Sequence, residues 1–340
     1  MPLTPLRSWR SGRVAGGALL VTAAAIGAAA LANRAVARRS ERAHPPPGHF
    51  IEVDGVRLHF LDRGSGSPIV LLHGNGAFVQ DWQASGIVDL LARDHRVIAF
   101  DRPGFGYTGR PRDRIWTPEA QAALLHAALT RLGVNNPVVV GHSWGALAAL
   151  ALALDHPRDV AALVLLAGYY FPTRRLDVAL LSGPAIPVWG HLIRHTILPP
   201  IGWLLRRPVM RRLFAPAPVT ARFRAEFPLA LSLRPAQLHA IAADTALMNP
   251  GAARLARRYR ELEIPAVIVS GIDDRIVDMR RQSRRLRGVL ANSIMYAVDG
   301  AGHMIHHLAP EMVIRAVTSA ERAAASGTRP SPVQAVTRPS

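Results

Sequence analysis

The sequence predicts an α/β fold in which a mostly parallel sheet is flanked by helices and carries a helical cap. Short apolar or β-branched runs alternate with helical patterns along much of the chain. One serine, Ser143, lies between glycines at the point where such a run meets a helical pattern. Residues 172–262, by contrast, carry no strand signal. Alternation of strands and helices is typical of a parallel sheet covered on both faces.

The expected sheet strands are short, apolar and mostly bounded by Gly, Pro or Asp, as buried parallel strands usually are. They are residues 68–72, 96–100, 137–140, 162–166, 266–270 and 293–298. Ahead of them, residues 50–53 and 57–61 predict a hairpin around Asp54-Gly55, a pair that favours a tight turn. Residues 118–132 are one of the helical patterns that fill the gaps.

The alternation breaks at residues 172–262, which are helical, punctuated by proline and strongly basic. We interpret this segment as a cap inserted after a sheet strand. Residues 50–171 and 263–324 then form the first and second parts of the core. A chain of 340 residues suits one large domain with an insertion better than two equal domains.

Part of the cap mixes apolar residues with paired arginines. Residues 197–205 are apolar and include Trp203, and the pairs Arg206-Arg207 and Arg211-Arg212 follow them. The favoured interpretation is a helix that buries its apolar face against the core and leaves its arginines in water. The alternative is an edge that rests on anionic lipid and admits amphiphilic substrates.

The N-terminus carries a candidate membrane segment. A basic segment at residues 1–13 precedes the uncharged residues 14–33, and twenty helical residues span about 30 Å, the thickness of a bilayer's hydrocarbon core. We favour an uncleaved single-pass anchor in the cytoplasmic membrane of a bacterium. The alternative is a signal peptide cleaved after Ala32, which would leave the protein secreted or periplasmic. Arginines flank both ends, so the orientation stays open.

Two further segments are expected to lie outside the folded domain. Residues 34–49 are rich in Arg and Pro and predict a stiff linker between anchor and domain. Residues 325–340 are rich in Pro, Ser, Thr and Ala without periodicity, which predicts a disordered tail.

Charge and cysteine content narrow the possible classes of function. The formal net charge is +18, and all 41 basic residues are arginine. No zinc-finger spacing, RNA-binding aromatic motif or basic heptad pattern accompanies them, so we expect no nucleic-acid partner. Cysteine is absent, which excludes disulfides, thiolate metal sites and a cysteine nucleophile but leaves the redox compartment open. The oligomeric state is also left open.

The strongest chemical motif is Gly141-His142-Ser143-Trp144-Gly145, which follows an apolar strand pattern and opens a helix. Glycines two positions before and after a serine permit a tight strand-to-helix turn that exposes the hydroxyl. The helix that follows directs its positive N-terminal end toward a developing negative charge. The motif therefore predicts that Ser143 is a nucleophile.

A second motif, His73-Gly74-Asn75-Gly76, directly follows the expected strand at residues 68–72. Its glycines let the loop fold close over the nucleophile. We expect the backbone N–H groups of Asn75 and Trp144 to form an oxyanion hole, in which each donor is typically worth about 10²–10³ in rate. His73 itself is expected to be structural.

A serine hydroxyl needs a base to take its proton, and that base needs a partner that fixes its tautomer. His303 follows Gly300-Ala301-Gly302 after the last expected strand, so small residues precede the imidazole and allow it into a crowded site. Asp273-Asp274 follows the strand at residues 266–270 and supplies a candidate carboxylate. The nearby His306 and His307 are expected to be incidental.

These motifs together resemble the α/β-hydrolase superfamily from about residue 50 to residue 320, and more narrowly its bacterial serine esterases, haloperoxidase-like enzymes and carbon–carbon hydrolases. Residues 100–106 match a loop of that family, and the G-x-x-D-x-x-V pattern at Gly271, Asp274 and Val277 and the G-x-G-H pattern ending at His303 match as well. The resemblance implies that Asp274 is the acid of the triad. Epoxide hydrolases and haloalkane dehalogenases of this fold carry an aspartate where this chain has Ser143, so those activities are disfavoured.

The resemblance implies a serine hydrolase that cleaves a carboxylic ester, or a related acyl bond, through Ser143, His303 and Asp274 with an acyl-enzyme intermediate. The expected partner is a small acyl substrate, amphiphilic if the cap edge faces lipid, and no metal or organic cofactor is needed. One alternative is hydrolysis of an amide, thioester or carbon–carbon bond by the same triad. An alternative of another class is a catalytically silent, membrane-tethered binding protein, against which the intact triad argues.

Overall fold

The computed structural model describes residues 8–173 and 181–330. Residues 1–7 of the predicted basic segment, residues 174–180 of the predicted cap and residues 331–340 of the predicted tail lie outside the described residues.

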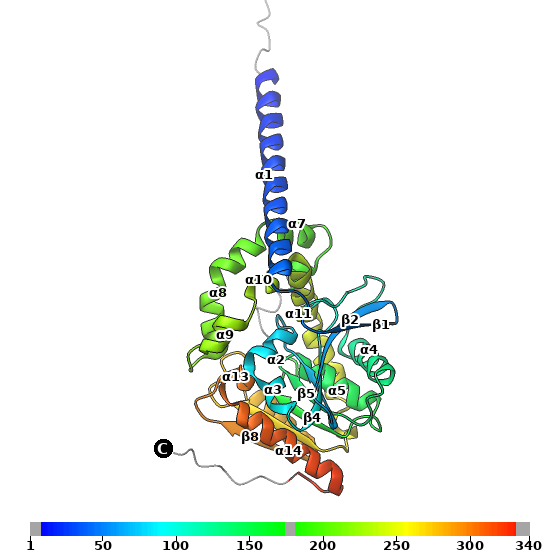
Figure 1. The fold of residues 1–340 in the computed structure, drawn as a ribbon. Helices are drawn as coiled ribbons and strands as arrows, with labels where there is room; N and C mark the ends of the chain where they lie inside the picture. The colour runs from blue at the N-terminus through cyan, green and yellow to red at the C-terminus, as the bar shows by residue number, and fades with distance from the viewer. Residues whose placement is uncertain (1–7, 174–180, 331–340) are drawn as a thin grey trace, which may run out of the picture.

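An eight-stranded sheet forms the centre of the domain, with the spatial order β1-β2-β4-β3-β5-β6-β7-β8. All neighbours are parallel except β2, which runs antiparallel to β1 and β4. This sheet, covered by helices on both faces (Figure 1), confirms the predicted fold class. The strands are β1 (His49–Val53), β2 (Val56–Arg63), β3 (Ser67–Leu72), β4 (His95–Phe100), β5 (Val138–His142), β6 (Ala162–Leu166), β7 (Ala266–Gly271) and β8 (Ser293–Val298).

Side chains alternate between two hydrophobic layers along the central strands, as the pleat of a strand requires. On β3, Val70 and Leu72 face one layer, whereas Ile69 and Leu71 face the other. The first layer packs against α4 (Pro118–Arg131), α5 (Gly145–Asp155) and α12 (Arg285–Val289), which follows the π-helical turn η3 (Arg280–Arg284). The second packs against α2 (Val79–Ser85), α3 (Ile87–Leu91), α13 (Ile305–Leu308) and α14 (Pro310–Ser326). Burial on both faces explains why the strands read as continuous apolar runs.

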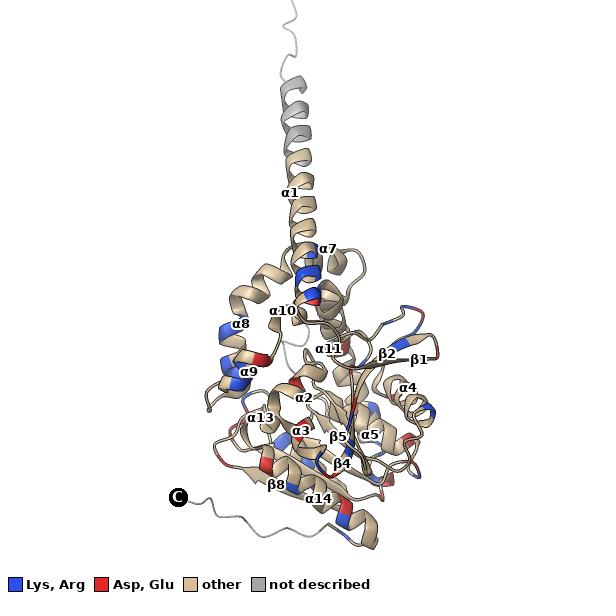
Figure 2. Cartoon of the chain, viewed as in Figure 1, with Lys and Arg blue, Asp and Glu red and all other residues tan. Residues whose placement is uncertain are grey.

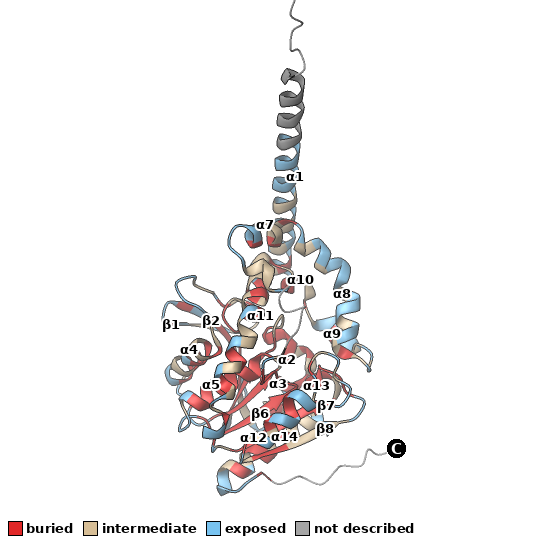
Figure 3. Ribbon diagram, turned by 180° about the vertical axis from the view of Figure 1, so that it is seen from behind, coloured by how far each residue is buried: buried red, intermediate tan, exposed pale blue. Residues whose placement is uncertain are grey.

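The helical segment between β6 and β7 lies above the carboxyl ends of the strands (Figure 1). The described elements are η1 (Gly183–Ala185), α7 (Trp189–Thr196), α8 (Leu198–Phe214), α9 (Ala221–Glu226), α10 (Leu229–Ser232), α11 (Pro235–Ala256) and η2 (Tyr259–Glu261). Helix α8 differs from the favoured interpretation of its sequence, because Phe214 is its sole buried residue. Large apolar side chains of α8, among them Trp203 and Leu204, are exposed instead (Figure 3).

Helix α1 (Ser8–Ala43) projects from the domain on the cap side (Figure 1). Within the described residues, Leu20–Ala43 is the one helical segment long and apolar enough to cross a membrane, a test that a signal sequence also passes. The helix continues through residues 34–43, which we expected in the linker. Its later turns are held by the cap: the Asn33 side chain donates hydrogen bonds to the carbonyl oxygens of His195 and Thr196, both at 2.9 Å. This support explains why the helix does not end at residue 33.

Candidate active site

Ser143 occupies a sharp turn between β5 and α5. Its φ is +52°, a left-handed conformation that non-glycine residues rarely adopt and that is associated with functional strain. The turn is held by a 2.9 Å hydrogen bond from the Ser143 N–H to the carbonyl oxygen of Leu166. At Gly145, a Cβ atom would lie 2.3 Å from the carbonyl oxygen of Leu72. The motif's second glycine is therefore needed for the close approach of α5 to β3.

His303 reaches Ser143 from the loop that follows β8. Its Nε2 lies 3.0 Å from the Ser143 Oγ, and its Nδ1 lies 2.8 Å from Asp274 Oδ2. The side chains of His303 and Asp274 are 4% and 2% exposed, so water does not compete strongly for this contact. The structure thus brings together the three side chains that the sequence predicts as a triad.

Asp274, rather than its neighbour Asp273, faces the histidine. Its second oxygen, Oδ1, accepts hydrogen bonds from the backbone N–H groups of Ile276 and Val277 at 2.7 and 3.0 Å. These bonds fix the carboxylate through the turn after β7. Asp273 is exposed and contributes a backbone N–H bond to Ala301.

The loop after β3 lies against the serine turn. A Cβ atom at Gly74 would meet the His142 Nδ1 at 2.9 Å and the Ser143 Cβ at 3.2 Å, so the approach depends on glycine. In the part of the chain that the structure describes, the backbone N–H groups of Asn75 and Trp144 donate to no protein acceptor. They therefore stay available for an oxyanion. The Asn75 side chain instead donates to Thr245 Oγ1 on α11, at 2.9 Å.

An apolar cavity of about 410 Å³ opens above Ser143 and His303. The core supplies its polar floor, and the cap supplies most of its walls. The wall residues from the cap helices include Leu205, Val209, Met210, Leu213, Leu238 and Ile241. Such a cavity, apolar with a few convergent polar groups, is the usual form of a small-molecule site.

A family model described as "Alpha/beta hydrolase family" matches residues 69–316, which include the serine turn, the Asp274 turn and the histidine loop. The chain belongs to this alpha/beta hydrolase family. Three proteins illustrate what the hydrolase resembles.

The 2-hydroxymuconate semialdehyde hydrolase of Pseudomonas sp. (strain CF600) is 37% identical over 151 residues, 43% of this chain. That alignment spans 50% of the relative's own length. The 2-hydroxy-6-oxo-2,4-heptadienoate hydrolase of Pseudomonas putida strain F1 is 29% identical over 266 residues, covering 76% of this chain and 90% of the relative. A solved structure titled as a membrane phospholipase A has a TM-score of 0.63 at 21% identity, covering 94% of this chain and all of that one. This last likeness concerns the fold alone.

The hydrolase also contains a buried histidine cluster that the sequence did not reveal. Asp81 on α2 lies between His306 Nε2, at 2.8 Å, and His307 Nε2, at 2.9 Å. Burial would raise the pKa of Asp81, but attraction by His306 and hydrogen bonds from both histidines hold that pKa well below its ordinary value. His306 and His307, which we expected to be incidental, therefore tie the segment after His303 to α2. No sequence spacing links Asp81 to residues so far along the chain.

His142 joins this cluster from the serine turn. Its Nε2 lies 3.1 Å from the backbone oxygen of His303. Burial, then the neighbouring His306 and His303, keep the pKa of His142 well below its ordinary value, so the ring is neutral and Nε2–H donates to that oxygen. Donor atoms of Asp81, His142 and His306 lie within 4.8 Å of one another, a spacing that could hold a metal ion. Both Asp81 oxygens bond to histidines, which supports the His303 loop, whereas the Nδ1 atoms of His142 and His306 are buried without a hydrogen-bond partner among the described residues.

A buried ion pair connects the cap to the floor of the site, and it too was missed. Asp244 on α11 pairs with Arg102 at 2.5 Å and with Arg110 at 3.0 Å, and the carboxylate is fully buried. Its backbone oxygen accepts a 2.9 Å hydrogen bond from the Trp144 indole N–H. Arg102 in turn donates to the backbone oxygen of His73. The residues on both sides of the predicted oxyanion hole are thus connected to one cap helix.

Proposed function

We propose that this alpha/beta hydrolase cleaves a carboxylic ester through an acyl-enzyme intermediate on Ser143. The observation that carries the proposal is the continuous chain of contacts from Ser143 Oγ through His303 to Asp274, at 3.0 and 2.8 Å, at the floor of an apolar cavity. A serine, a histidine and a carboxylate in this order form the arrangement that activates a hydroxyl for attack on a carbonyl carbon.

In the first stage, His303 Nε2 takes the Ser143 proton as Oγ attacks the ester carbonyl carbon. The N–H groups of Asn75 and Trp144 donate to the oxygen that becomes negative. Asp274 keeps His303 in the tautomer with a proton on Nδ1 and stabilises the imidazolium. The imidazolium then protonates the departing alcohol oxygen, which leaves the acyl group bonded to Ser143.

In the second stage, His303 Nε2 takes a proton from water, and the resulting hydroxyl attacks the acyl carbon. The same two N–H groups hold the second oxyanion. Its collapse breaks the bond to Ser143 Oγ, and His303 returns the proton to that oxygen. The carboxylic acid departs and the resting site is restored.

The lining of the cavity supports an acyl substrate with an apolar chain. Its walls include the apolar side chains of Leu205, Val209, Met210, Leu213, Leu238 and Ile241. Each methylene that leaves water contributes about 0.8 kcal/mol to binding. We therefore expect medium-chain esters to be cleaved more efficiently than acetate esters.

Fluorophosphonate labelling of the full chain in detergent tests the proposal. The wild type is expected to be labelled and Ser143→Ala is not. Ser232→Ala is the matched control, since this serine lines the same cavity and bonds to the Gly76 oxygen, and it should be labelled like the wild type. A folded wild type without labelling would contradict the proposal and favour the catalytically silent, membrane-tethered binding protein.

A second candidate is hydrolysis of a carbon–carbon bond by the same three residues. The names of the two Pseudomonas relatives favour it, because one is a hydrolase of 2-hydroxymuconate semialdehyde and the other a hydrolase of 2-hydroxy-6-oxo-2,4-heptadienoate, and neither name describes an ester. The assay compares 2-hydroxy-6-oxo-2,4-heptadienoate with a p-nitrophenyl butyrate standard. A higher kcat/KM for the oxo acid would replace the ester proposal, while amide and thioester substrates form further arms of the same assay.

We also propose that α1 anchors the hydrolase in a bacterial cytoplasmic membrane. Apolar side chains of the helix, among them Leu20, Val21, Leu31 and Val36, are exposed, and a bilayer would cover them. Extraction of membranes with alkaline carbonate should leave the protein in the pellet with its full intact mass. A mass lacking the first 32 residues would instead favour the cleaved signal peptide and a secreted or periplasmic protein.

The exposed edge of α8 supports contact between the cap and lipid. Trp203 and Leu204 are 50% and 75% exposed, and α8 and α9 carry arginines along the same side of the cap (Figure 2). Apolar and aromatic residues beside arginines favour anionic interfaces. Leu204→Asp should lower hydrolysis of an ester embedded in phosphatidylglycerol vesicles and leave hydrolysis of p-nitrophenyl butyrate unchanged. A Leu204→Asp variant that hydrolyses the vesicle-embedded ester as fast as the wild type would contradict lipid contact at this edge.

A further inference from the structure

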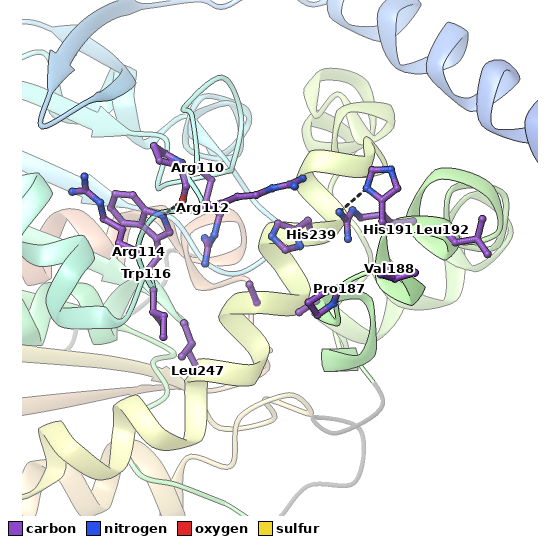
Figure 4. A pocket seen from close by; sticks show the side chains of 15 residues that line it. Arg110, Arg112, Arg114, Trp116, Pro187, Val188, His191, Leu192, His239 and Leu247 are labelled. Carbon is purple, nitrogen blue, oxygen red and sulfur yellow. Dashed lines mark hydrogen bonds between the residues drawn. The ribbon is translucent and has the colours of Figure 1, made fainter.

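A second cavity, of about 800 Å³, lies on the opposite side of α11 from the catalytic cavity. Helix α11 presents Ile241 and Thr245 to the catalytic cavity. It presents His239, Ala243 and Leu247, which are four residues apart and share another face, to the second cavity. Figure 4 shows His239 and Leu247 on this face. The two cavities are thus separated by the thickness of one helix.

Basic side chains converge on the second cavity from two sides. Arg110, Arg112 and Arg114 enter from the segment before α4 (Figure 4). Arg194 lines the cavity from α7. Among the described residues that line the cavity there is no aspartate or glutamate. Arg110 and Arg114 pair with Asp244 and Asp113, which lie outside the lining. The positive charge without a carboxylate partner among the described residues is therefore that of Arg112 and Arg194.

Arg194 shows this imbalance most clearly. The residue is only 6% exposed, and its hydrogen bonds go to the Pro184 carbonyl oxygen at 3.2 Å and to the His191 Nδ1 at 3.1 Å. Neither partner carries a negative charge. Burial, and then the charge of Arg112, lower the pKa of Arg194. Within residues 8–173 and 181–330 Arg194 bonds to no carboxylate. Because a buried charge without a counter-charge is costly, an anion at this position would stabilise the fold.

Two neighbours of Arg194 also have free capacity for an anion. Arg112 makes no ion pair with the described part of the chain. The Nδ1 atom of His239 is buried and has no hydrogen-bond partner there. Burial, then Arg194 and Arg110, lower the pKa of His239 to about 4, so its ring is neutral at pH 7 and can donate one N–H. Arg110 has less capacity, since it shares Asp244 with Arg102.

The remaining walls of the cavity are apolar. They are formed by side chains of Ile115, Trp116, Val188, Leu192 and Leu247. Ile115 and Val188 are 71% and 81% exposed, although both are aliphatic. A ligand that matches this cavity needs an apolar portion beside its charged group.

We propose that this cavity binds an amphiphile with one oxyanion group, a carboxylate or phosphate. The oxygens of that group contact Arg194, Arg112 and His239. The apolar portion of the ligand contacts Trp116 and Leu192. Guanidinium groups match the geometry of both oxyanions. The ligand is either a free acid in water or a lipid of the bilayer. A lipid is included because α7, which supplies Arg194, is hydrogen-bonded to the proposed anchor α1 through Asn33. Binding here involves none of the residues proposed for ester cleavage.

The test is fluorine NMR of the full chain in nonionic detergent, with 5-fluorotryptophan in place of its six tryptophans. The variants Trp116→Phe and Trp144→Phe assign the resonances that report on the second cavity and the catalytic cavity. Hexyl phosphate is expected to shift the Trp116 resonance with saturation, and hexanol and inorganic phosphate should each bind at least about tenfold more weakly. Phosphatidylglycerol nanodiscs form the lipid arm, with phosphatidylcholine nanodiscs as their control.

Arg194→Gln is expected to weaken hexyl phosphate at least about tenfold. Arg112→Gln changes an exposed residue and keeps the test valid if Arg194→Gln does not fold. Arg260→Gln, an exposed arginine remote from the cavity lining, is the matched control and should bind like the wild type. Saturation by hexyl phosphate assigns a soluble source, and saturation in phosphatidylglycerol nanodiscs alone assigns a lipid source. No saturable shift of Trp116 in either arm, equal binding of inorganic phosphate, or binding unaffected by both variants would overturn the proposal.

Discussion

In the cavity above Ser143, the floor that the core supplies and the cap walls, here called the roof, are built differently. On the floor, the three side chains predicted as a triad have specific partners: His303 lies between Ser143 and Asp274, and Asp274 is held by two backbone N–H groups. The roof consists of cap helices whose contacts are mainly apolar, and α8 exposes most of its surface to solvent (Figure 3). Helix α11 joins the two parts through the buried Asp244, and α8 does so through Leu213, whose carbonyl oxygen accepts a hydrogen bond from the His303 N–H.

This difference indicates a division of labour. Reaction geometry tolerates errors of only about 0.5 Å, so it is placed on strand ends held by the densely packed core. Selection of an acyl chain depends on the volume and shape of an apolar wall, which helices of the cap can supply with less constraint. Changes in the floor should therefore affect rate and stability, and changes in the roof should affect which ester is cleaved.

The largest expected effect is on kcat and comes from Asp274, the carboxylate that contacts His303. Asp274→Asn should lower kcat by about 10⁴, because an amide no longer holds His303 in the productive tautomer. Steady-state hydrolysis of p-nitrophenyl butyrate measures the change. The neighbouring Asp273→Asn alters an exposed side chain and should retain nearly all activity. Similar losses in both variants would contradict the assignment of Asp274.

The next largest effect is expected on stability, at the Asp244 ion pair that connects the cap to the core. Asp244→Ala should reduce the free energy of unfolding by about 3–5 kcal/mol, because it leaves the buried Arg102 without its counter-charge. Glu119→Ala is a matched control, since Glu119 pairs with Arg254 at the exposed end of the same α11. That control should cost less than about 1 kcal/mol. Urea denaturation compares the two, and equal costs would remove the special role of Asp244.

Acid should destabilise the floor through His73. Burial, then the charge of Arg102, lower the pKa of His73 to about 3, below the unfolded value of about 6.5. The unfolded chain therefore binds this proton first, and stability is lost as the pH falls from about 6.5 toward 3. Between pH 7 and pH 5 this loss amounts to about 2 kcal/mol.

Urea midpoints of His73→Gln measured at both pH values should show a smaller loss by about that amount. His44→Gln, which changes an exposed histidine, should keep the pH dependence of the wild type. A His73→Gln variant with the full wild-type dependence would contradict the burial of a neutral imidazole at this position.

The smallest effect concerns the roof. Val209→Trp fills part of the catalytic cavity and should lower the ratio of kcat/KM for octanoate over butyrate esters by about tenfold, the scale expected for one or two methylene contacts. Leu204→Trp enlarges an exposed residue of the same helix that does not line the cavity, and the ratio should stay unchanged. A shift of equal size in both variants would indicate a general change in the cap.

Local patterns were sufficient to predict most of the core from the sequence. The expected strands at residues 162–166 and 293–298 coincide with β6 and β8, because buried parallel strands are marked by uninterrupted apolar runs. The hairpin was equally clear, and Asp54 and Gly55 both have positive φ as its turn requires. Ser143, His303 and the pair Asp273-Asp274 were found because each follows a strand, and the carboxyl ends of parallel strands meet at one edge of the sheet. The family resemblance then selected Asp274 over Asp273.

What the sequence could not provide are contacts made across long separations without a motif. Asp81 meets His306, and Arg102 meets Asp244, over 225 and 142 residues, and no periodicity connects such pairs. The surface of α8 was also misjudged: an apolar stretch was expected to be buried, yet Phe214 is the sole buried residue of this helix. Its pattern specifies a helix but not which neighbour covers it.

Helix α1 has a consequence for how this enzyme would meet its substrate. Its 36 residues extend about 54 Å, more than a hydrocarbon core, and its lower end is hydrogen-bonded to the cap rather than joined by a loose chain. As an anchor this rigid helix would hold the domain at a fixed distance from the membrane surface and at a fixed angle to it. The rate of hydrolysis of membrane esters would then depend on their surface density near the anchored domain and on the lateral diffusion of enzyme and ester. It would depend little on the bulk concentration of the ester.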